Sequence, residues 1–178
     1  MSQIETHNDA FKVVREVLIP MFYKETQLAR SFRNISKQEK LEFKKELFKA
    51  ILELADRVDK NTLKNEHLRE KIKNLSDNTS GTIGQAQKVI NVYLKYYSIL
   101  TGKKIELLRE LDCPLDSKVM SRYERQLGLK RLSLKNMDDM LTYETWQNGL
   151  KKTGRGLRIS PDLQTYDPER IRDYLTKM

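Results

Sequence analysis

Two ionisable side chains in the stretch 81–129, Lys88 and Asp116, are capable of catalytic chemistry. A lysine amine that has lost its proton can attack an electrophilic carbon and form a Schiff base, so Lys88 is a candidate nucleophile. A carboxylate such as that of Asp116 can stabilise positive charge that develops beside it. Asp116 and Ser117 also suit the N-cap of a following helix. Asp116 therefore has two interpretations, a helix cap and a catalytic carboxylate.

Glycines precede the helix that carries Lys88. Gly81 and Gly84 flank a turn, and backbone N–H groups at a helix N-terminus can hold a phosphate. The alternative is a plain loop and helix start, because glycine pairs are common turn signals. Apolar residues recur after Gly84 at steps of three and four, which predicts a helix to about residue 101. Lys88 and Lys95 lie on another stripe of this helix, so Lys95 is a further candidate contact to nucleic acid.

Basic side chains gather in two further places. Arg122 and Arg125 lie away from the apolar side of the helix after Asp116, where they are available to solvent or to a ligand. Residues 149–158 combine three glycines with four cations, namely Lys151, Lys152, Arg155 and Arg158. A flexible backbone with cations suits phosphate contacts, which set affinity rather than sequence preference. The alternative for this stretch is a mobile surface loop.

The net charge of the 178-residue chain is +9, which favours an anionic partner such as nucleic acid. Residues 1–80 carry 16 basic and 13 acidic groups, and residues 81–178 carry 18 and 12. The positive excess therefore lies more in the later half of the chain, where the candidate site residues are.

Other classes of site find no support in the sequence. A single cysteine excludes an internal disulfide and a cysteine-rich zinc site, and it favours a reducing, cytoplasmic location. The two histidines are far apart in the sequence, so we expect no metal, and no motif implies a cofactor. No apolar run approaches the roughly 20 residues of a membrane span. The polar, acidic start is unlike a signal peptide.

The pattern of apolar residues predicts an all-α, compact multi-helix domain. Helices are expected at about residues 8–19, 36–58, 61–75, 85–101 and 117–127, with a last one after residue 167. The second of these starts with a capping box, Ser36 to Glu39. Another helix is expected to run to residue 150, with Ser133 or Asn136 as its cap. A polar break at 76–82 suggests an N-terminal helical part, 1–80, and a part that holds the candidate site, 81–178. A single domain is the alternative.

The sequence around Asp116 resembles a known family. Asp116-Ser117-x-Val119, followed by Arg122, Arg125 and Leu127-Gly128-Leu129, is similar to a segment of the helix-hairpin-helix DNA glycosylases. Upstream, Gly81 to Gly84 followed by Lys88 resembles the glycine hairpin of that family and the lysine of its lyase members. The stretch is also similar to small uncharacterised bacterial helical proteins, which imply no function.

The resemblance implies a base-excision glycosylase or lyase that acts on a damaged or modified base in DNA. Lys88 would then attack the sugar carbon, and Asp116 would stabilise the charge that forms there. The glycine turn and the basic residues would hold the DNA backbone, and the target base would leave the stack. The alternative function is a non-catalytic basic helical protein that binds nucleic acid or a partner protein.

Overall fold

The computed structural model describes residues 32, 35–101, 107 and 109–153, and every regular element in these ranges is helical. The elements are α2 (Lys37–Asp59), α3 (Asn65–Asn78), α4 (Ile83–Leu100), α6 (Ser117–Leu127), the short 3-10 helix η2 (Leu134–Asn136) and α7 (Met140–Thr153). The all-α prediction is confirmed for this part of the chain. The helices predicted at residues 8–19 and after residue 167 lie outside the described residues.

The start of α2 has the predicted capping box. The amide of Ser36 donates to Oε2 of Glu39 at 2.8 Å, and the amide of Glu39 donates to Oγ of Ser36 at 3.2 Å. These bonds satisfy two N–H groups that would otherwise have no partner within the helix. The hydroxyl of Ser80 also donates to Glu39, at 2.7 Å, and so ties the turn before α4 to the start of α2.

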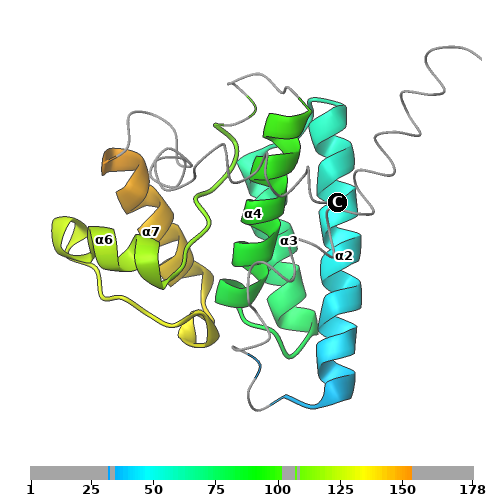
Figure 1. Ribbon diagram of the computed structural model, residues 1–178, viewed down its shortest axis with the longest axis horizontal. Coiled ribbons are helices and arrows are strands. Elements are labelled where there is room, and N and C mark those ends of the chain that lie inside the picture. Colours follow the sequence, from blue (N-terminus) through cyan, green and yellow to red (C-terminus); the bar gives the residue numbers. More distant parts are fainter. Residues whose placement is uncertain (1–31, 33–34, 102–106, 108, 154–178) are drawn as a thin grey trace, which may run out of the picture.

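Helices α2, α3 and α4 lie side by side, and α4 contacts both of its neighbours as well as η2 and α7 (Figure 1). From residue 83 to residue 98, every residue of α4 is buried except Lys88, which is partly exposed. A helix that is covered on nearly all sides belongs to a protein core. Buried side chains of α2, α3, α4, α6 and α7 form one hydrophobic cluster, which spans both sides of residue 80.

Two helices begin later than the sequence predicts. The expected start of α3 near Asn61 is a turn instead, in which Asn61 has a positive φ of 54°. The predicted cap residues of α7, Ser133 and Asn136, flank or lie within η2. The cap of α7 is Asp139, whose Oδ1 accepts a hydrogen bond from the amide of Thr142 at 2.7 Å.

Residues 111–116, directly before α6, have no regular secondary structure. Residues 111–115 are all buried. Asp116 then caps α6, and Gly128 ends it with a φ of 63°, a left-handed conformation that glycine adopts without steric cost. Both predicted ends of α6 are confirmed. Helix α6 packs on α7, and the two lie beside the bundle of α2, α3 and α4 (Figure 1).

Candidate functional site

Lys88 and Asp116 are neighbours in space. Nζ of Lys88 lies 3.6 Å from Oδ2 of Asp116, and the two side chains are 19% and 31% exposed. Lys88 comes from the first half of α4, and Asp116 lies at the N-terminus of α6. The structure therefore brings together the two residues that the sequence singles out for chemistry, at a position that solvent can reach.

The carboxylate of Asp116 also has a structural role. Its Oδ1 accepts hydrogen bonds from the amides of Lys118 and Val119, both at 2.9 Å. The helix-cap interpretation of Asp116 is thus confirmed, while Oδ2 faces Lys88. A lysine nucleophile must lose its proton and leave its ion pair before it can attack a carbon. In this arrangement both groups of the pair have a partner within the protein.

The glycine turn does not offer its amides to a phosphate, which corrects the sequence-based prediction. The amide of Gly84 donates to the carbonyl of Met137 at 2.8 Å, and that of Gly81 donates to Oγ1 of Thr79 at 3.2 Å. Both glycines serve close packing instead. A Cβ on Gly81 would lie 2.1 Å from the ring of Phe43, and one on Gly84 would lie 2.3 Å from a backbone oxygen of η2.

The side chain of Lys95 is not exposed, although the sequence suggests a contact to nucleic acid. Its side chain is fully buried, and its ammonium lies 5.0 Å from the centre of the Tyr96 ring. Lys88 and Lys95 share one stripe of α4, but only Lys88 reaches solvent, because every residue from 89 to 98 is buried. Lys95 is therefore not available to a nucleic acid at the surface, and the prediction for this residue is wrong.

Arg122 and Arg125 are exposed, as expected, and they belong to a larger basic surface. We define the basic face as the six exposed cations of residues 117–136, which are Lys118, Arg122, Arg125, Lys130, Arg131 and Lys135. Glu124 is the one acidic residue in the same stretch. Sequence reasoning missed four of these cations, although the spacing of Lys118 from Arg122 places both on one side of α6.

The second predicted basic cluster is described only in part. Lys151 and Lys152 are exposed in the last turn of α7, where positive charge also suits the helix dipole. Arg155 and Arg158 lie outside the described residues. The dipole therefore gives Lys151 and Lys152 a sufficient structural reason to be at this position.

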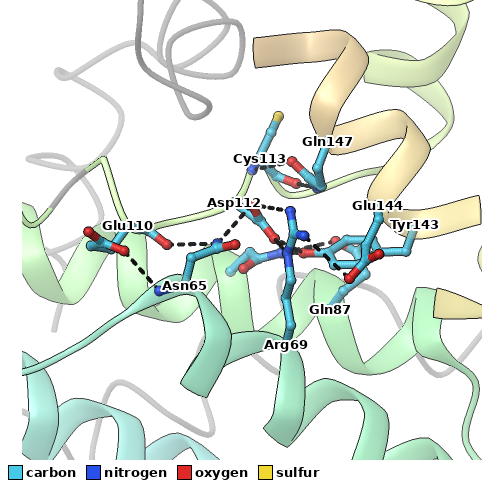
Figure 2. Close-up of polar contacts among 10 residues, drawn as sticks. Asn65, Arg69, Gln87, Glu110, Asp112, Cys113, Tyr143, Glu144 and Gln147 are labelled. Carbon is cyan, nitrogen blue, oxygen red and sulfur yellow. Dashed lines mark hydrogen bonds and ion pairs between the residues drawn. The ribbon is translucent and has the colours of Figure 1, made fainter. Parts of the chain in front are cut away.

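A buried polar network occupies the centre of the molecule, and the sequence gives little sign of it. Figure 2 shows Asp112 surrounded by donors from two helices. Nε of Arg69 donates to Asp112 at 3.1 Å, Nδ2 of Asn65 at 3.0 Å, and the hydroxyl of Tyr143 at 3.0 Å. Asp112 is fully buried, so these donors replace water around its charge. Arg69 reaches Glu144 of α7 as well, at 3.3 Å.

Two glutamine side chains pair with the backbone of the buried segment 111–115. Gln147 accepts from the amide of Cys113 at 2.9 Å and donates to its carbonyl at 2.8 Å. Gln87 does the same with Leu115, at 3.0 Å and 2.8 Å. A carboxamide has the same donor and acceptor groups as a peptide unit. Each glutamine therefore pairs with the N–H and C=O of one residue, as a residue of a neighbouring β-strand would. They satisfy backbone groups that would otherwise be buried without partners.

The electrostatics of this network favour a closed, structural role. Burial raises the pKa of Tyr143 well above its usual value, and the nearby charge of Asp112 raises it further. Burial lowers the pKa of Arg69, but the charge and hydrogen bond of Asp112, together with the nearby Tyr143 and Glu144, outweigh this and raise the pKa overall. The guanidinium and the phenol thus both keep their protons, and the network holds a fixed charge pattern rather than a group poised for proton transfer.

No cluster of three or more metal-ligating side chains occurs among residues 35–101 and 109–153 or at the two separately described positions. No described helix is long and apolar enough to cross a membrane. Comparison of the chain with protein-family models, curated proteins and solved structures finds no match. The resemblance to the helix-hairpin-helix glycosylases therefore rests on the sequence motifs.

Proposed function

We propose that this protein binds nucleic acid, DNA in the first place, through the basic face. The observation that carries the proposal is the uneven distribution of charge. Residues 117–136 hold six exposed cations and one carboxylate. By contrast, α2 has six cations and six carboxylates, and α3 has three of each. The positive charge is thus concentrated in one exposed stretch of the chain, which suits phosphate binding.

The basic face is also held in a defined shape. Lys118, Arg122 and Arg125 follow one another at steps of four and three, so they form a stripe along one side of α6. Apolar residues on the opposite side, Val119 and Met120, are buried. The ends of α6 are fixed by its cap at Asp116 and by Gly128. A prearranged stripe loses little conformational entropy on binding, which favours affinity.

Fluorescence anisotropy with a labelled DNA duplex tests this proposal. The informative variant is Arg122→Gln with Arg125→Gln, because both side chains are exposed. We expect weaker binding. The slope of log binding constant against log salt concentration should be smaller in magnitude by about two, because each lost phosphate contact lowers it by about one. The control is Lys37→Gln with Lys45→Gln, which removes the same charge from exposed positions of α2.

The outcomes separate the alternatives. If the wild-type protein fails to bind duplex or single-stranded DNA or RNA at low salt, the proposal is wrong and a protein partner becomes the better hypothesis. If the α2 control weakens binding as much as the α6 variant does, net charge rather than the basic face is responsible. An intracellular location, which the single cysteine favours, is consistent with a nucleic acid partner.

A second candidate function is base excision, and the 3.6 Å separation of Lys88 and Asp116 favours it. After losing its proton, the Lys88 amine would add to the sugar C1′ while the base leaves with the bonding electron pair and takes up a proton. Asp116 would stabilise the positive charge on the sugar during this step. Ring opening would then give a Schiff base between Lys88 and the sugar.

Borohydride trapping on a duplex that contains an abasic site or an oxidised base tests the second candidate. A covalent adduct that forms with wild type and with Lys45→Ala, but not with Lys88→Ala, supports it. Lys45 is a suitable control because it is an exposed lysine of α2, outside the basic face. Absence of an adduct with wild type, or an adduct that persists in Lys88→Ala, excludes Lys88 as the nucleophile. Asp116→Asn should slow trapping if the carboxylate takes part.

A further inference from the structure

We infer that the basic face recognises the sugar–phosphate backbone of a duplex rather than a single strand, an inference that rests on the proposed function. Proteins that hold single strands combine a basic groove with exposed aromatic rings on which the bases stack. Proteins that hold a duplex need cations at fixed positions, because the bases are already stacked on one another.

The basic face has cations but no stacking platform. Tyr123 is the one aromatic residue between positions 117 and 136. Its ring packs against the hydrophobic core and is only partly exposed, so it is engaged within the protein. Trp146, the single tryptophan of the chain, is 2% exposed on α7. The exposed side chains of this stretch are therefore cations and small or uncharged polar groups, without an exposed aromatic ring.

The spacing of the cations suits a regular array of phosphates. From Lys118 to Arg125, the stripe on α6 extends about 10 Å along the helix axis. One strand of a duplex presents a phosphate about every 3.4 Å along its axis, so the stripe matches about three of them. A flexible single strand can adapt to many arrangements of cations, so it depends less on a fixed spacing. The fixed spacing on α6 therefore favours a rigid partner over a flexible one.

The backbone of the segment that follows α6 is anchored at Leu134 and Met137. Oγ1 of Thr82 donates to the carbonyl of Leu134 at 2.7 Å, and the amide of Gly84 donates to the carbonyl of Met137 at 2.8 Å. These bonds attach η2 to the start of α4. Figure 1 shows that α6 and the connection to η2 run along one edge of the molecule. Lys135 lies between these two anchored residues, and Lys130 and Arg131 lie between them and the end of α6.

The test compares one duplex with each of its separated strands, at equal length and salt. We expect the duplex to bind at least about tenfold more tightly than either strand, with a log–log salt slope near −5 if all six cations contact phosphates. Trp146 fluorescence should stay unchanged on binding, because this ring is buried. Tyr123→Leu keeps an apolar group against the core, and it should leave duplex affinity within about twofold of wild type.

The results distinguish this inference from the proposed function. If neither duplex nor single strand binds at low salt, the proposed function itself fails. If single strands bind as tightly as the duplex, only the duplex inference fails. Loss of about tenfold or more in single-strand affinity in a folded Tyr123→Leu variant would indicate base stacking on this ring, and would overturn the inference in the same way. A parallel measurement with an RNA and a DNA duplex shows which of the two the basic face binds more tightly.

Discussion

Replacing Asp112 by asparagine should destabilise the protein more than any substitution at a surface ion pair. Asp112 is fully buried and accepts hydrogen bonds from Arg69, Asn65 and Tyr143. Asparagine has nearly the same volume, so the change leaves no cavity. It removes the negative charge and replaces one acceptor oxygen by an NH₂ group. This group faces hydrogen-bond donors and cannot accept a bond from them.

The expected cost follows from the partners that remain. The side chain of Arg69 is 17% exposed, so its charge is largely withdrawn from water. Removal of one member of a buried ion pair costs about 3–5 kcal/mol, because the remaining charge is left without compensation. Glu144 lies 3.3 Å from Arg69 and offsets part of this cost, so we expect a value near 3 kcal/mol. For a chain of this length, that corresponds to a fall in melting temperature of about 6–12 °C.

Urea unfolding at neutral pH measures the effect, since a shift of the midpoint at constant slope reports stability. The matched control is Asp77→Asn, because Asp77 is 52% exposed and pairs with Lys73 on the surface of α3. This control should cost no more than about 1 kcal/mol. In a double-mutant cycle, Asp112→Asn with Arg69→Met should cost less than the sum of the two single changes, by about 2 kcal/mol.

Two results would refute the reasoning about Asp112. The first is a cost of Asp112→Asn that equals that of the Asp77→Asn control, which would mean that the charge of Asp112 is not needed inside the protein. The second is strict additivity in the cycle with Arg69→Met, since residues in direct contact should couple. Either result would show that the buried network contributes packing but no specific electrostatic stabilisation.

Three further predictions concern single positions. Gly84→Ala should cost about 1–3 kcal/mol in urea unfolding, because the new Cβ would lie 2.3 Å from a backbone oxygen of η2. Hydrogen bonds from Ser36 and Ser80 lower the pKa of Glu39 to about 2, so the ionised carboxylate contributes fully to folding stability at neutral pH. This contribution should fade as the pH falls from about 4.5 to 2, and melting curves of Glu39→Gln should not show that loss. The raised pKa of Tyr143 means that the folded state holds this proton above pH 10, so stability should fall as the pH rises past about 10, and Tyr143→Phe should reduce that fall.

Local signals in the sequence located the helices well where a cap and an apolar stripe agree. The capping box at Ser36 and the pair of Asp116 and Gly128 around α6 are confirmed, because these motifs act over one turn and need no distant partner. The predicted start of α7 was wrong, because serine at position 133 is as suitable a cap residue as aspartate at position 139. Only the packing of η2 against α4 decides between them.

The buried polar network could not be predicted in the same way. Arg69 lies on α3 among charged residues, so its type and spacing indicate a solvated face. Its partner is more than 40 positions away in the sequence. The one available signal was Asp112 itself, a carboxylate within the apolar run from Leu111 to Leu115. A charge in such a run indicates a buried partner, but it does not say which of the chain's 34 cations provides it.

The segment between Asp112 and Asp116 connects the stability of the core with the position of the basic face. At one end Asp112 is fixed by α3 and α7, and at the other Asp116 caps α6 and faces Lys88 of α4. Helix α6 therefore takes its orientation from three other helices. Substitutions in the network should change nucleic acid binding only as far as they unfold the protein, whereas Arg122→Gln should weaken binding and leave stability unchanged. Stability and binding measured on the same variants would thus separate residues that build the surface from residues that use it.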